Sequence, residues 1–258
     1  MDAFDREILT LSLERLKDIL PMTPAALMKE YEEDSRRYCV ETIGDHVFCL
    51  FTWPVLSDLE RIILLVFDSS RQIIADIGAY HTDAKSFLES REIYDYLSEE
   101  SDWMYLEHYV LSSTVFHMYP YPFCLSSQKA EEAGEVLIYV NAYVSRAMRR
   151  QHIFRAMLES VSCHVFQEAT GILPVYSVFS LDPDIACFGP DAEDEPYYYS
   201  YEADEPVRRR NARIAERIGF TPLKLEMEHP EEETDGTKLW FCVGQELFEA
   251  AETPFGKC

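Results

Sequence analysis

A strand–helix–strand unit in the second half of the chain limits the fold more than any other feature. Residues 135–144 (EVLIYVNAYV) follow Gly134 and predict a central strand. From about Met148 to about Ala169 the apolar residues recur at helical spacing, and residues 175–180 predict the next strand. Strands that alternate with a helix are typical of α/β proteins, so we expect a sheet with helices packed on it.

The first half predicts helices followed by a run of strands. Thr23 and Pro24 are suited to be the N-cap and first position of a second helix. The expected elements are helices at 3–20 and 23–38, strands at 46–53, 61–68 and 72–80, a helix at 82–97, a strand at 109–118, a helix at 207–218 and a closing hairpin from 223–228 and 239–243. The predicted fold class is therefore layered α/β, with a mixed, mostly antiparallel central sheet flanked by helices.

Net charge narrows the range of partners. The chain carries 47 acidic and 23 basic residues, a formal net charge of −24. A nucleic acid or an anionic membrane is a poor partner for such a surface, whereas a cationic amine would be attracted. Acidity that only keeps the protein soluble explains the composition equally well.

Cysteine and histidine spacing predicts no metal site. The seven cysteines are widely spaced without a Cys-x-x-Cys pair, and His81, His108 and His164 have no ligand-like spacing. The longest apolar run, residues 62–67, is too short to cross a bilayer, and the first residues carry acids where a signal peptide would be basic. We therefore expect a cytoplasmic protein.

Basic residues gather in two short windows of this acidic chain. Residues 146–155 hold four arginines and no acid, and residues 208–217 hold five arginines and one acid. Such density suggests a bound anion with more than one charged group. The first window lies where the strand at 135–144 leads into a helix, and a helix N-terminus attracts phosphate. A surface cluster that pairs with nearby carboxylates is the alternative.

Both windows resemble motifs of the GNAT N-acetyltransferase superfamily. Residues 144–158 (VSRAMRRQHIFRAML) are similar to its acetyl-CoA motif, with Arg149 at the Arg/Gln position and His152 and Phe154 where glycines are expected. Residues 208–220 (RRRNARIAERIGF) are similar to the late helix of a branch that ends in Ser-x-Arg-Val-Ala-Glu-Lys-x-Gly-Phe. The two motifs lie about 60 residues apart in the order the family has them.

The resemblance implies a fold and an activity. It implies a GNAT-like acyltransferase domain over residues 44–258, with residues 1–43 as a helical extension packed on it. It implies transfer of an acetyl group from acetyl-CoA to a primary amine of a small molecule or protein. A catalytically inactive GNAT-fold protein that binds acyl-CoA as a sensor, or acts as an interaction protein, is the alternative.

The resemblance also assigns site residues. The acetyl-CoA contacts it implies are Ala142, Tyr143, Val144, Arg149, Arg150, Gln151, His152, Ile153, Phe154, Arg155 and Asn211.

Catalytic groups are assigned less directly. Glu135 and Tyr199 are candidates for base and acid, His117 is a further base candidate, and Ala215 stands where many relatives have a tyrosine. The acidic segment at residues 182–184 lies where an amine could bind, although a turn explains it as well. The expected partners are acetyl-CoA and a cationic small molecule or protein amine, without nucleic acid or membrane; a homodimer stays open.

Overall fold

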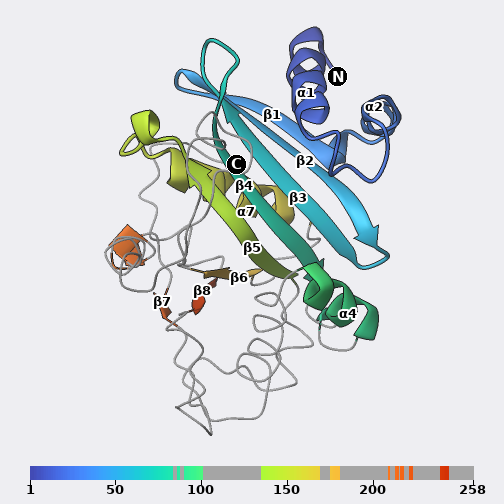
Figure 1. Ribbon diagram of the computed structural model, residues 1–258, viewed down its shortest axis with the longest axis vertical. Coiled ribbons are helices and arrows are strands. Elements are labelled where there is room, and N and C mark those ends of the chain that lie inside the picture. The colour runs from blue at the N-terminus through green and yellow to red at the C-terminus, as the bar shows by residue number, and fades with distance from the viewer. Residues whose placement is uncertain are drawn as a thin grey trace, which may run out of the picture.

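One mixed sheet organises the described part of the chain. The computed structural model describes residues 1–83, 86–87, 90–100, 135–168, 175–180, 209, 213–214, 216–217, 221–222 and 239–243. Its elements are α1 (Ala3–Arg15), α2 (Pro24–Glu33), η1 (Ser35–Arg37), β1 (Tyr38–Ile43), β2 (His46–Leu56), β3 (Leu59–Phe67), β4 (Ile73–Asp83), α4 (Arg91–Glu100), β5 (Glu135–Val144), η3 (Arg146–Met148), α7 (Ile153–Glu168), β6 (Val175–Ser180), β7 (Thr221–Pro222) and β8 (Leu239–Val243). The strand order is β1-β2-β3-β4-β5-β6-β8-β7 (Figure 1).

Strands β1 to β5 form an antiparallel series in which each strand pairs with the one before it. Tight turns set this register. Gly44 has a φ of 61° in the two-residue turn between β1 and β2, a backbone that favours glycine. After β3, the Asp68 carboxylate accepts hydrogen bonds from the N–H groups of Ser70 and Gln72, which closes the next hairpin.

One face of the sheet is covered by α1 and α2 (Figure 1). Apolar side chains of β2 and β3 alternate toward these helices, among them Phe51, Ile63 and Leu65, and they are almost fully buried. Tyr31 of α2 donates a hydrogen bond of 2.9 Å to the Thr52 carbonyl, which fixes the helix to β2. Helices α1 and α2 therefore pack directly on the sheet.

The other face is covered by α7. Ile62, Leu64 and Ile77 point toward Met157 and Val161 of this helix, and all five are buried. The helix connects β5 to β6, which run parallel. The remaining pairings, β6 with β8 and β7 with β8, are antiparallel. The mixed, mostly antiparallel sheet flanked by helices that the sequence predicts is thus confirmed.

Several predicted bounds are wrong, and pairing between strands explains most of the differences. Residues 38–43, predicted as the end of the helical extension, form β1 because they pair with β2. In the range predicted as one helix at 82–97, Thr82 and Asp83 still pair with β5, Ser86 and Phe87 are helical, and α4 begins at Arg91.

Helix ends account for the rest. The helix predicted at 3–20 stops at Arg15, where the Leu16 N–H closes a tight last turn on Ser12 and Leu13. The second helix starts at Pro24 behind the predicted N-cap Thr23, which is confirmed, but ends at Glu33. The strand predicted at 109–118 lies outside the described residues. The division at residue 43 into an extension and a main domain stays a prediction.

Leu13→Ala tests how much α1 contributes to stability. Leu13 is fully buried against the sheet, so its truncation leaves a cavity and should lower the free energy of unfolding by about 2–5 kcal/mol. Leu11→Ala on the same helix is the matched control, because Leu11 is 41% exposed and its loss should change stability by less than about 0.5 kcal/mol. Urea unfolding measures both. Equal effects would mean that α1 does not dock as described.

Candidate functional site

The loop between β5 and α7 has an unusual backbone. Ser145 donates its N–H to the Ile74 carbonyl at 2.8 Å, which fixes the start of the loop to β4. After η3, Arg150 and His152 adopt φ values of 72° and 62°, the left-handed region that glycine favours. Each such residue costs on the order of 1–2 kcal/mol. His152 stands where the resembling motif expects a glycine, so a glycine-like backbone is present there without the glycine.

The arginines of this loop occupy different positions. Arg149 and Arg150 are exposed, and Arg149 Nε donates a hydrogen bond of 3.0 Å to the Val144 carbonyl, with its guanidinium 5.9 Å from the centre of the Tyr143 ring. Arg155, one turn into α7, forms an ion pair of 2.8 Å with Glu159. Two positive charges therefore lie just before the positive end of the α7 dipole, where they are unfavourable in the absence of an anion.

The described pairing of β5 with β6 covers only the first half of β5. It joins Glu135–Tyr139 to Val175–Phe179, β6 is described as far as Ser180, and β5 continues to Val144. Directly after Tyr139, Val140 forms a bulge against β4: Tyr139 pairs with Ala79 and Asn141 with Gly78, which leaves Val140 without a partner on β4. Val140 is 37% exposed. The backbone of β5 is therefore irregular in the middle of the strand, before the loop that leads to α7.

A polar network crosses β3, β4 and β5 next to the bulge, on the face that α1 and α2 cover further along the sheet. Asn141 Nδ2 donates a hydrogen bond of 2.8 Å to Asp76, which is fully buried. Arg61 of β3 stacks 4.4 Å above the ring of Tyr80. Sequence reasoning missed these residues, although a single aspartate in the apolar run IIADIGAY of β4 was a signal.

A second titratable cluster lies on the opposite face, between the sheet and α7. Thr52 donates a hydrogen bond of 2.6 Å to Glu60, and His81 Nδ1 lies 3.7 Å from the other Glu60 oxygen. Burial acts to raise the pKa of Glu60, but His81 and the Thr52 hydrogen bond outweigh it and the pKa is lowered. His164 of α7 is also buried. The fold thus brings His81 and His164 to the same region, although they lie far apart in the sequence.

The predicted catalytic residues are placed only in part. Glu135 begins β5, where its backbone pairs with Asp83 on one side and Val175 on the other. Tyr199, Asn211, Ala215, His117 and residues 182–184 lie outside the described residues. Of the second arginine window, residues 209, 213, 214, 216 and 217 are helical and exposed.

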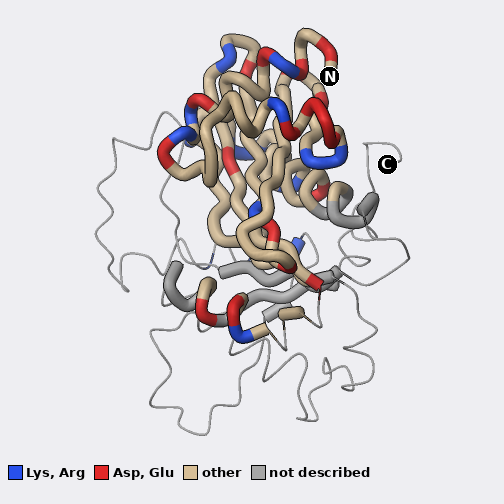
Figure 2. Tube along the Cα trace, turned by 90° about the vertical axis from the view of Figure 1, so that its right-hand side faces the viewer, with Lys and Arg blue, Asp and Glu red and all other residues tan. Residues whose placement is uncertain are grey.

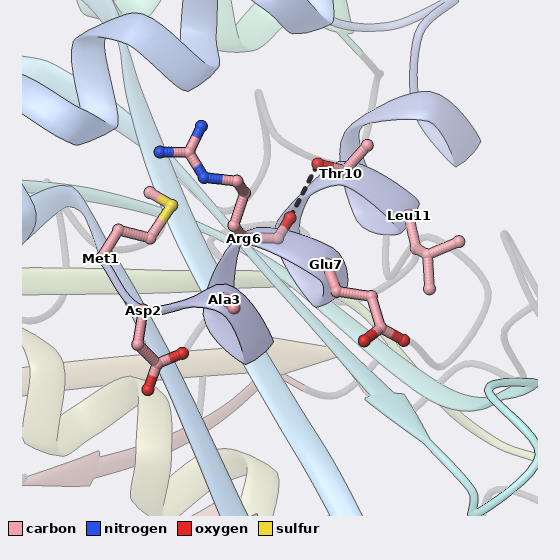
Figure 3. Close-up of a pocket in the computed structure, with 7 residues that line it drawn as sticks. All are labelled: Met1, Asp2, Ala3, Arg6, Glu7, Thr10 and Leu11. Carbon is pink, nitrogen blue, oxygen red and sulfur yellow. Dashed lines mark hydrogen bonds between the residues drawn. The ribbon is translucent and has the colours of Figure 1, made fainter.

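A shallow hollow of about 560 Å³ lies elsewhere, on the outer side of α1 (Figure 3). It is lined by residues 1–3, 6, 7, 10 and 11 alone, and Figure 3 shows the Thr10 hydroxyl bonded to the Arg6 carbonyl of the same helix. No second element closes it, so it is not a candidate for catalysis.

Charged residues are distributed unevenly over the elements of the fold. Figure 2 shows few charged residues along the middle of the strands, with most of them on helices and turns. In the described part of the chain, no group of three His, Cys, Asp or Glu side chains is arranged to hold a metal ion. Within the same residues, no helix has the length and apolar character needed to cross a membrane.

His152→Gly tests the strain in the loop before α7. Glycine adopts the observed φ without steric cost, so the free energy of unfolding should rise by up to about 1 kcal/mol after the greater entropy of the unfolded chain is subtracted. Gln151→Gly is the matched control, because Gln151 does not have a positive φ and its replacement should only destabilise. Denaturant unfolding of both variants measures the difference. A loss of stability in both would contradict the left-handed backbone at His152.

His164 predicts a pH-dependent stability. Burial lowers the pKa of His164 below its ordinary 6.5, Glu60 opposes this and His81 adds to it. The unfolded chain therefore takes up a proton at higher pH than the folded chain, so stability is full above about pH 6.5 and falls as the pH decreases toward the folded pKa.

The melting temperature should accordingly fall between about pH 7 and pH 5.5, and His164→Gln should remove part of that fall. His152→Gln, which changes an exposed histidine, should leave the pH dependence unaltered. A pH profile that is the same in wild type and His164→Gln would show that His164 is not buried in its neutral form.

Comparison with known proteins gives matches to structures only. No family model and no curated protein matches the sequence. Among solved structures, an agmatine N-acetyltransferase mutant in its apo form aligns over 70% of this chain and 72% of its own at 12% identity and a TM-score of 0.37.

Two further structures align over more of the chain. A GNAT-family acetyltransferase from Staphylococcus aureus covers 94% of both chains at 9% identity and a TM-score of 0.32. NAA60 from Arabidopsis thaliana in complex with acetyl-CoA covers 92% of this chain and 93% of its own at 13% identity and a TM-score of 0.33.

Proposed function

We propose that the protein is an acetyl-CoA-dependent N-acetyltransferase that acts on a primary amine of a small molecule or protein. The observation that carries the proposal is the loop before α7. Arg150 and His152 hold a glycine-like backbone at the end of a central strand and directly before a long helix. Strained backbone of this kind persists where the surrounding structure requires it, most often at ligand-binding sites.

Acetyl-CoA would fit this loop through its phosphates. The pyrophosphate would lie at the N-terminus of α7, against the backbone of residues 150–155, where the helix dipole favours negative charge. Arg149 and Arg150 are exposed there, and a bound polyphosphate turns their unfavourable position into an attraction. Asn211 is proposed as a further contact from the late helix.

The pantetheine arm would follow β5. Its amides would bond to the backbone of Ala142, Tyr143 and Val144, beyond the part of β5 whose pairing with β6 is described. The thioester would then lie near the Val140 bulge, in the middle of the sheet. The reacting carbon would then lie beside Asn141 and the Asp76 carboxylate to which Asn141 donates a hydrogen bond.

The chemistry needs positioning more than special groups. The amine nitrogen forms a bond to the thioester carbonyl carbon, the carbon–sulfur bond breaks, and the proton of the amine leaves to a base. The chain would hold both substrates in line and polarise the carbonyl with a backbone N–H. Glu135 and Tyr199 are proposed as base and acid.

Acetyl-CoA binding is the first test. The ligand should raise the melting temperature, and Arg149→Ala should weaken binding about 10- to 150-fold, because a guanidinium–phosphate contact contributes about 1.5–3 kcal/mol. Arg91→Ala is the matched control, since this arginine is 91% exposed on α4 and should leave the affinity unchanged. Isothermal titration calorimetry measures the acetyl-CoA affinity of the wild type and of both variants. No binding at millimolar acetyl-CoA would reject the proposal.

Thiol release over a panel of amines then separates an enzyme from a sensor. Free CoA that forms only with an amine present supports acetyl transfer. Tight binding without thiol release on any amine would favour the alternative, an inactive GNAT-like protein that senses acyl-CoA. The residues in place of the motif's glycines, His152 and Phe154, are the observation that favours this second function.

A further inference from the structure

Arg61 carries a positive charge that the described residues do not neutralise. It stands on β3 directly opposite Tyr80 of β4, and its guanidinium carbon lies 4.4 Å from the centre of that ring. The Nη1 atom is shut off from solvent and has no hydrogen-bond partner within the described part of the chain. No carboxylate of the described residues lies within ion-pair distance of it.

A partly buried arginine without an ion-pair partner is unexpected in this protein. Acidic residues outnumber basic ones two to one, so carboxylates are abundant. Leaving a guanidinium N–H without an acceptor costs about 1–3 kcal/mol, more for a charged group. The nearby carboxylate on the same face of the sheet, Asp76, accepts its hydrogen bond from Asn141 instead. A ligand that brings its own anion would remove this cost.

Gly78 brings the two polar side chains of this region together. A carbon atom added at Gly78 would clash with Asn141 Oδ1 and would lie 3.0 Å from Arg61 Nη2. The glycine therefore allows Arg61 and Asn141 to approach over a single residue of β4. This position pairs with Asn141 and borders the Val140 bulge, next to the proposed position of the thioester.

We propose that Arg61 is an anion subsite for the acyl acceptor, so that the acceptor is an amino acid or a similar amine with a carboxylate. The inference rests on the proposed acetyl transfer and deepens it. A guanidinium binds a carboxylate through two parallel hydrogen bonds, and the contact with the Tyr80 ring helps to hold the Arg61 side chain in position. Arg61 as a whole is partly exposed, which leaves a route from solvent.

The amine of such a molecule would lie over Asn141. Its amide oxygen is an acceptor for an ammonium group, and the residue is adjacent to the Val140 bulge of β5. The acidic surface would attract the amine, while Arg61 would orient the molecule through its carboxylate. A plain diamine would use only the first of these interactions.

Ligand binding tests the subsite without catalysis. The melting temperature is measured with each proteinogenic amino acid, and with tyramine, histamine, cadaverine and agmatine as the counterparts that lack the carboxylate. At least one amino acid should stabilise the protein, and a counterpart without the carboxylate should not. Arg61→Gln should weaken that binding about 10- to 100-fold, as expected for a charged bidentate contact. Arg61→Lys should keep part of it.

Stability of the unliganded variants separates a binding role from a structural one. Arg61→Gln removes an unpaired inner charge, so its unfolding free energy should equal or exceed that of the wild type. Arg36→Gln, at an exposed arginine beside β1, is the control for loss of one guanidinium and should bind the amino acid normally.

Three outcomes would overturn the proposal: no amino acid binds, the counterpart without the carboxylate binds equally well, or Arg61→Gln binds as tightly as wild type. Acetyl-CoA titration is run on the same samples. Loss of acetyl-CoA binding rejects the proposed transferase, whereas the amino-acid panel decides on Arg61 by itself.

Discussion

The structure depends on burying the central strands β2, β3 and β4 from both sides. Side chains of a strand alternate between faces, so one register sends Ile63 and Leu65 toward α1 and α2 and sends Ile62 and Leu64 toward α7. A slip of one residue would exchange the two sets, so that the helices on each face would meet side chains that they do not fit. The same register sets the position of the loop between β5 and α7, since the Ser145 N–H at its start is hydrogen-bonded to the Ile74 carbonyl of β4.

The sequence predicts those elements whose own residues decide their state. Strands 135–144 and 175–180 are predicted at their observed bounds, because continuous β-branched and aromatic runs stop at turn-forming residues. Strand β1 could not be predicted from residues 38–43, which alternate charge and apolarity weakly and become a strand only through pairing with β2. The same holds for Thr82 and Asp83, where pairing with β5 overrides a helical pattern.

The candidate site could be predicted from the sequence only in part. Arginine density in 146–155 identifies the loop, since it is a property of the sequence itself. The left-handed backbone at Arg150 and His152 could not be predicted, because the residue types argue against it. Nor could the network of Arg61, Asp76 and Asn141, whose members are far apart along the chain and meet only through strand register. Residues that contact each other across a sheet are not recognisable from any single segment of the sequence.

The connection of α7 has a consequence for synthesis on the ribosome. Strands β1 to β4 pair only with one another and with β5, so the first 83 residues can form four strands with α1 and α2 on one face. The opposite face, with Ile62, Leu64 and Val66, remains in contact with water until residues 153–168 emerge. A nascent chain that stalls before this helix therefore presents an apolar surface, which α7 covers once it packs on the sheet.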